Sequence, residues 1–161
     1  MTAQKEIPIK GAHYVSTEHV DAVLREYKQT RWVQNSDRLG KADSLSVWFS
    51  LEAMEDFLNT TKSNGGDGVK LYFSVYTEEF APCPEYIGRQ TITMVATKSR
   101  KTEMGTITNK DLYITKNGRS IILGQNWGTI CPPTCNLSTE GGTGDLGITI
   151  VDKGENGMEI V

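Results

Sequence analysis

Residues 69–76 read Val-Lys-Leu-Tyr-Phe-Ser-Val-Tyr, and this alternation of apolar and polar side chains predicts a β-strand. Its apolar face carries Val69, Leu71, Phe73 and Val75. Residues 90–97 alternate in the same way, with Ile92, Met94 and Ala96 on one face. We therefore expect the two segments to be antiparallel neighbours at the centre of a sheet, joined by a long loop at 77–89.

A helix is predicted over 17–31. Ser16 is a suitable N-cap, and the apolar residues behind it recur at intervals of three and four, as on one buried helical face: Val20, Val23, Leu24 and Tyr27. Residues 34–44 are polar and are expected to form a loop.

A second helix is predicted after a short strand at 45–49. Ser50 is its N-cap, and the glycines of 64–68 end it, because glycine adopts left-handed conformations at little cost. Later in the chain, Asn117-Gly118 lies between two β-rich segments within 111–123. This dipeptide tolerates the positive φ of a tight turn and predicts a hairpin.

Helices early in the chain and strands late favour an α+β fold, in which two helices from the N-terminal half pack on one face of a mostly antiparallel sheet. The length of 161 residues fits a single domain over 1–161. The end, 137–161, is rich in glycine and is expected to be flexible, to form an edge hairpin or to supply a partner-dependent strand.

The composition argues against two classes of partner. The net charge of −3 and the pI of about 5.4 are unlike those of a protein that holds phosphate backbones, so nucleic acid is not expected. The cations of 98–101 are then best explained as a solvated turn. The start has no signal-peptide pattern, and no run approaches the roughly 20 apolar residues of a membrane span. We expect a cytoplasmic protein without a membrane partner.

The segment Cys131-Pro132-Pro133-Thr134-Cys135 places two thiols four residues apart. An extended path would separate their Cα atoms by about 12 Å, beyond the reach of a disulfide, whereas a turn at Pro133 would bring them near each other. A structural zinc ion needs four ligands, of which Cys83 is a possible third and His13 or His19 a fourth. The favoured interpretation is that the cysteines are small, buried and reduced, with no metal and no cofactor.

The loop at 77–89 carries Phe80, Tyr86 and Arg89 among prolines. One interpretation is a recognition loop, with aromatic anchors and with Arg89 as a clamp for an anion or a carboxylate. The other is a long connection whose aromatic side chains pack on the sheet.

Three common catalytic motifs are missing: the chain has no phosphate-binding loop, no nucleophile elbow and no zinc-protease helix. We therefore expect a non-enzymatic binding module for a protein or a small ligand, which presents the loops 77–89 and 126–135. Its expected binding residues are Phe80, Tyr86, Arg89 and Trp127. The first alternative is a thiol-based redox or metal-binding protein that uses Cys131 and Cys135, with Cys83. The second is a structural subunit that assembles through edge strands.

Four segments resemble those of a group of small uncharacterised proteins common in Bacteroidota. They are residues 47–52 (Val-Trp-Phe-Ser-Leu-Glu), 68–76, 91–97 and the Cys131-Pro-Pro-Thr-Cys135 end. The resemblance covers about 45–135, and its distinctive part is the Cys-Pro-Pro-x-Cys segment. It implies a bacterial source and a domain kept as a unit, but no activity and no site residues.

Overall fold

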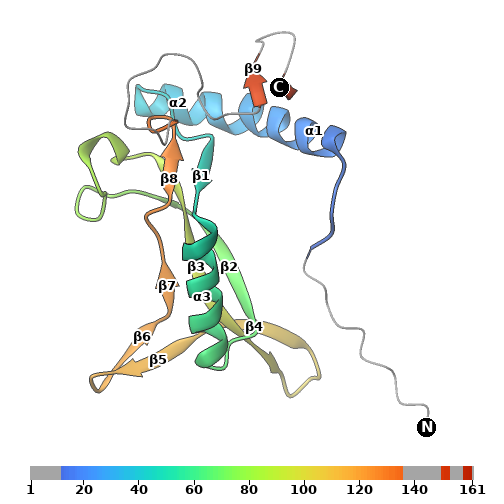
Figure 1. The fold of residues 1–161 in the computed structure, drawn as a ribbon, viewed down its shortest axis with the longest axis vertical. Coiled ribbons are helices and arrows are strands. Elements are labelled where there is room, and N and C mark those ends of the chain that lie inside the picture. Colours follow the sequence, from blue (N-terminus) through green and yellow to red (C-terminus); the bar gives the residue numbers. More distant parts are fainter. Residues whose placement is uncertain (1–11, 136–149, 153–157, 161) are drawn as a thin grey trace.

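A computed structural model of the chain describes residues 12–135, 150–152 and 158–160 (Figure 1). The fold is α+β and mostly sheet, as predicted. The helical elements are α1 (Thr17–Tyr27), a π-helical turn (Lys28–Trp32), α2 (Val33–Leu39), α3 (Leu51–Ser63) and a 3₁₀ turn (Pro84–Tyr86). The strands are β1 (Ser46–Trp48), β2 (Gly68–Val75), β3 (Gln90–Lys101), β4 (Ile107–Asp111), β5 (Tyr113–Lys116), β6 (Arg119–Ile122), β7 (Gly124–Gln125), β8 (Thr129–Cys131), β9 (Ile150–Asp152) and β10 (Met158–Ile160).

The main sheet has the order β2-β3-β4, and β7 pairs with the middle of β3. The strands β2 and β3 are antiparallel over their whole common length, from Gly68 opposite Thr97 to Val75 opposite Gln90, which confirms the predicted pairing. The prediction that both lie at the centre was wrong for β2, because among the described residues β3 is the central strand and β2 forms an edge.

The cations at 98–101 do not form a turn. Lys98, Arg100 and Lys101 continue β3 and pair with β4, a strand that the sequence analysis did not predict. The real turn comes at 102–105, where Gly105 has a φ of +81°. Charged side chains are compatible with a strand whose outer end is exposed, so their polarity did not mark its end.

The hairpin at Asn117-Gly118 is confirmed. β5 and β6 pair antiparallel, and the two turn residues have φ values of +51° and +74°. At the C-terminal end β9 and β10 also pair antiparallel, so this end contains a hairpin, and β10 contacts α1. The pair forms a two-stranded sheet of its own rather than an edge of the main sheet. The remainder of 137–161 lies outside the described residues.

The N-terminal helix is longer than predicted. α1, the π-helical turn and α2 follow each other without interruption from Thr17 to Leu39, so the predicted loop at 34–44 was wrong over its first half. The helix ends at Gly40, which has a left-handed conformation with a φ of +71°. Polar residues alone did not break it, because most of them are compatible with an exposed helix. Ser16 and Ser50 cap α1 and α3 as expected.

The interior is small and divided into two clusters. In the first, Phe57 of α3 packs on Met94 and Ala96 of β3. In the second, Tyr76, Tyr86 and Ile130 pack together. Among the described residues eight apolar side chains are buried, whereas nineteen large ones are exposed, so this fold leaves much apolar surface uncovered. No helix in the described part of the chain is long and apolar enough to cross a membrane.

Candidate binding surface

The loops 77–89 and 126–135 meet at the cluster of Tyr76, Tyr86 and Ile130. The hydroxyl group of Tyr86 accepts a hydrogen bond from the backbone N–H of Ile130 (3.3 Å) and donates one to the Thr134 hydroxyl group (3.2 Å). The rings of Tyr76 and Tyr86 lie 5.5 Å apart between centroids, at a tilt of 39°. The two loops are therefore neighbours in the structure.

The loop 77–89 is stabilised by backbone hydrogen bonds between its two ends. The N–H of Tyr76 bonds to the carbonyl of Arg89 (3.1 Å), and the N–H of Gly88 bonds to the carbonyl of Tyr76 (2.8 Å), which closes the base of the loop. Within it, Pro84 begins the short 3₁₀ turn, a position that suits proline. Gly88 has a φ of +79°, and a Cβ atom there would lie 2.6 Å from Leu39 Cδ1. The loop is therefore ordered and packs against the end of α2.

The four predicted binding residues divide into two pairs. Tyr86 and Arg89 are buried, and Arg89 donates from Nε to the carbonyl of Glu85 (2.8 Å). Its Nη1 atom is buried without a hydrogen-bond partner. In this conformation both side chains support the loop from within. Phe80 and Trp127, by contrast, are 65% and 69% exposed.

Asn126 holds the start of the second loop, and its role was missed in the sequence. Its Oδ1 atom accepts hydrogen bonds from the hydroxyl groups of Tyr76 (2.9 Å) and Thr91 (3.3 Å) and from the N–H of Trp127 (2.5 Å). Its Nδ2 atom donates to the Thr93 hydroxyl group (2.9 Å). Burial raises the pKa of Tyr76, so its hydroxyl group stays protonated and able to donate near neutral pH.

Trp127 leaves this network in an unusual backbone conformation, with a φ of +70°. Bulky side chains rarely adopt positive φ values. The next residue, Gly128, is buried, and a Cβ atom there would lie 2.7 Å from Phe49 Cζ and also meet Val47 Cγ1. The chain therefore turns sharply at Asn126, exposes the indole ring and returns to pack closely against β1.

The prediction of reduced cysteines at 131 and 135 was wrong in this structure. Cys131 and Cys135 form a disulfide with an S–S distance of 1.98 Å, and their Cα atoms lie 4.7 Å apart. At this Cα separation the segment is folded back rather than extended, and the peptide bonds before Pro132 and Pro133 are both cis. The loop beyond Trp127 is therefore closed by a covalent link.

This pairing limits the metal-binding alternative and is compatible with the redox alternative. A cysteine binds zinc as a thiolate, which the sulfurs of a disulfide do not supply. Cys83 is a free cysteine, half-buried beside Tyr76 and Tyr86. Within residues 12–135 and the two short C-terminal strands, no three histidine, cysteine or acidic side chains are grouped as they would be to bind a metal ion.

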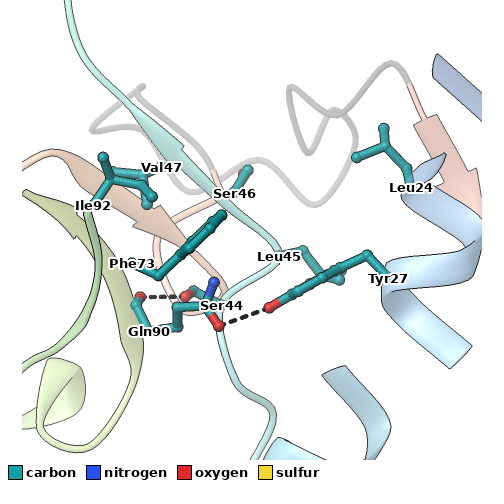
Figure 2. Close-up of a pocket in the computed structure, with 9 residues that line it drawn as sticks. All are labelled: Leu24, Tyr27, Ser44, Leu45, Ser46, Val47, Phe73, Gln90 and Ile92. Atoms are coloured by element: carbon teal, nitrogen blue, oxygen red, sulfur yellow. Dashed lines mark hydrogen bonds between the residues drawn. The ribbon is translucent and has the colours of Figure 1, made fainter. Parts of the chain in front are cut away.

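A pocket of about 180 Å³ lies between α1 and the sheet (Figure 2). Its apolar walls are Leu24 and Tyr27 of α1, Leu45, Val47, Phe73 and Ile92. The Tyr27 hydroxyl group donates to Gln90 Oε1 (2.8 Å), and the Ser44 hydroxyl group donates to the carbonyl of Gln90. Pockets for small molecules usually measure about 300–1,000 Å³, so this one has room for a single side chain rather than a ligand of that size.

Comparisons with models of known protein families, with curated proteins and with solved structures found no match.

Proposed function

We propose that the protein is a non-enzymatic interaction module that binds a partner protein through the loops 77–89 and 126–135. The observation that carries the proposal is Trp127, a largely exposed tryptophan held at a φ of +70°. An unfavourable backbone conformation persists only when its surroundings enforce it, and such residues are concentrated at binding and catalytic sites.

The surroundings of Trp127 supply that enforcement. Asn126 makes four hydrogen bonds, three of them to Tyr76, Thr91 and Thr93 in the sheet and its adjoining loop. On the other side of Trp127, Gly128 packs against Phe49. The indole therefore projects from a fixed point, and a side chain fixed in advance loses less conformational entropy on binding.

The chemistry of the surface favours a protein partner. Tryptophan is enriched among the residues that contribute most to protein–protein binding. Phe80 is a second exposed aromatic on the adjoining loop, where turn hydrogen bonds from the N–H groups of Phe80 and Ala81 to the carbonyl of Thr77 hold the backbone. The exposed rings of Trp127 and Phe80 are suited to a partner protein with apolar pockets that can bury them.

The test is quantitative co-purification from the organism of origin, with tagged wild-type protein and three variants. Trp127→Ala and Phe80→Ala remove the proposed anchors. Met104→Ala is the matched control, because Met104 is a large apolar residue that is 93% exposed in the turn between β3 and β4.

We expect Trp127→Ala to reduce recovery of a specific partner by at least about 30-fold, the loss that corresponds to a hot-spot residue of 2 kcal/mol. The Met104→Ala variant should recover the partner at the wild-type level. Equal recovery by Trp127→Ala and wild type would overturn the proposal, provided that both proteins unfold at the same denaturant concentration.

A further inference from the structure

The strand β2 has a free edge. Among the described residues β3 is the only strand that pairs with it, along one side. β2 is eight residues long and contains no proline. Its single charged residue, Lys70, forms an ion pair with Asp111 of β4 (2.8 Å). Edge strands of natural proteins are commonly shortened, covered or interrupted by proline or charge, because a free edge templates pairing with another chain.

The same strand also leaves an apolar face uncovered. Leu71, Phe73 and Val75 are 58%, 82% and 58% exposed, although they lie on the face that α3 covers on the neighbouring strand β3, at Met94 and Ala96. Figure 1 shows α3 lying over β3, with β2 beside it. Phe73 also lines the pocket under α1, so the uncovered face extends into a hollow (Figure 2).

We propose that β2 pairs antiparallel with β2 of a second copy of this chain, which joins the two main sheets across a two-fold axis. The surface is self-complementary, as a two-fold interface requires. Residues opposite each other in an antiparallel pair share a face, so self-pairing places the apolar face of one copy beside the apolar face of the other.

The sequence of β2 selects one register. With Tyr72 at the two-fold axis, Leu71 lies opposite Phe73 of the second copy, and Val69 lies opposite Val75 of the second copy. Lys70 then faces Ser74 of the second copy, so no like charges are opposed. Moving the axis to Leu71 or to Phe73 leaves one of the four apolar residues without an apolar partner.

The exposed area points to a weak, reversible dimer. Taking about 200 Å² as the full exposure of a large side chain, the exposed parts of Leu71, Phe73 and Val75 on the apolar face amount to roughly 400 Å² per copy, and side-by-side pairing covers the part of it that faces the second copy. A stable interface buries about 800 Å² per partner, so the strand pair buries less than that. The backbone hydrogen bonds of the new strand pair add to the affinity.

The first test is sedimentation of the full chain at several concentrations. We expect a reversible dimer, and we expect Phe73→Lys to raise its dissociation constant at least tenfold while Met104→Lys leaves it unchanged. Trp127→Ala should dimerise like the wild type, so this result is independent of the proposed partner site. A wild-type protein that stays monomeric at several hundred micromolar, as it would if the edge were already covered, overturns the proposal.

The second test reads the register by oxidative cross-linking in a Cys83→Ser background. Tyr72→Cys should cross-link to itself, whereas Leu71→Cys and Phe73→Cys should cross-link when mixed and not when oxidised separately. Cross-linking of Leu71→Cys to itself would overturn the register, and a dimer without any of these cross-links would overturn the interface. Since all three positions are exposed, the variants are expected to fold, which far-ultraviolet circular dichroism checks.

Discussion

Asn126 is the residue that shapes the proposed binding surface. Its side chain lies between β3 and the loop 126–135. It forms hydrogen bonds with Thr91 and Thr93 of β3 and accepts one from the backbone N–H of Trp127. A half-buried amide with both of its groups satisfied can fix the direction of a loop more firmly than apolar contacts do, because the unmade bonds would be costly.

Replacing Asn126 should therefore weaken both the fold and the surface. We expect Asn126→Ala to lower the free energy of unfolding by about 2–3 kcal/mol, because the Tyr76 hydroxyl group loses this acceptor in a buried place and the Thr93 hydroxyl group keeps only its bond with Ser74. Urea denaturation measures this change. Asn59→Ala, on the exposed surface of α3, is the matched control and should change it by less than about 0.5 kcal/mol. An equal effect of the two substitutions would contradict the role given to Asn126.

Some single residues could be identified from the sequence and others could not. Ser16, Ser50 and the Asn117-Gly118 turn were predicted correctly, because capping and turn formation depend on near neighbours in the chain. The role of Asn126 could not be predicted, because its side-chain partners in the sheet lie more than thirty residues away in sequence. The disulfide was missed for a different reason, since the sequence shows two thiols four residues apart but not whether the segment between them is turned or extended.

At the scale of elements, an ion pair links the two outer strands of the main sheet across β3. Lys70 of β2 lies 2.8 Å from Asp111 of β4, and the Tyr72 hydroxyl group also donates to this carboxylate (2.9 Å). These hydrogen bonds, chiefly the one from Lys70, hold the pKa of Asp111 below its ordinary value. In turn, the hydrogen bond to Asp111 raises the pKa of Lys70.

The shift of Asp111 predicts how stability changes in acid. Because its folded-state pKa is lowered, the pair contributes stability above the ordinary aspartate pKa of about 4, and this contribution is lost as the pH falls through the lowered value. We expect Asp111→Asn to be less stable than the wild type at pH 7, with the difference shrinking below pH 4. Urea denaturation at a series of pH values measures it.

The control for this prediction is Asp56→Asn, which changes an exposed carboxylate on α3. It should show no such convergence with the wild type in acid. The difference in free energy of unfolding between Asp111→Asn and the wild type should not stay constant from pH 7 to pH 2.5. A constant difference would mean that the Asp111 carboxylate is not charged and paired with Lys70 as described.

The type of most elements could be predicted from the sequence, but their ends could not. The alternation at 69–76 and 90–97 identified β2 and β3, and their pairing was correct. The first helix was predicted to end at 31, because the residues after it are polar, yet it continues to Gly40, where a left-handed residue ends it. A run of polar residues indicates that a segment is exposed to solvent, but exposure alone does not end a helix or a strand.

At the scale of the whole molecule, the notable property is the balance between buried and exposed apolar residues. Eight are buried and nineteen large ones are exposed among the described residues, so contacts within this part of the chain leave many large apolar side chains uncovered. The exposed set includes Trp127 and Phe80 on the two loops and the apolar face of β2. Both of our proposals assign these places to partners. Hydrophobic alternation showed which residues share a face, but it could not show that the face of β2 is left uncovered, because coverage depends on where α1 and α3 pack.

The most direct measurement of the central claim is site-specific photo-cross-linking in the organism of origin. A photoreactive phenylalanine analogue is placed at position 127, and in a separate protein at position 104, which is exposed but lies outside the proposed surface. We expect a discrete adduct with one partner protein at 127, which excess wild-type protein abolishes and excess Trp127→Ala does not, and no discrete adduct at 104. The same adducts at both positions, or no adduct at 127 in cells where the tagged protein is abundant, would contradict the account.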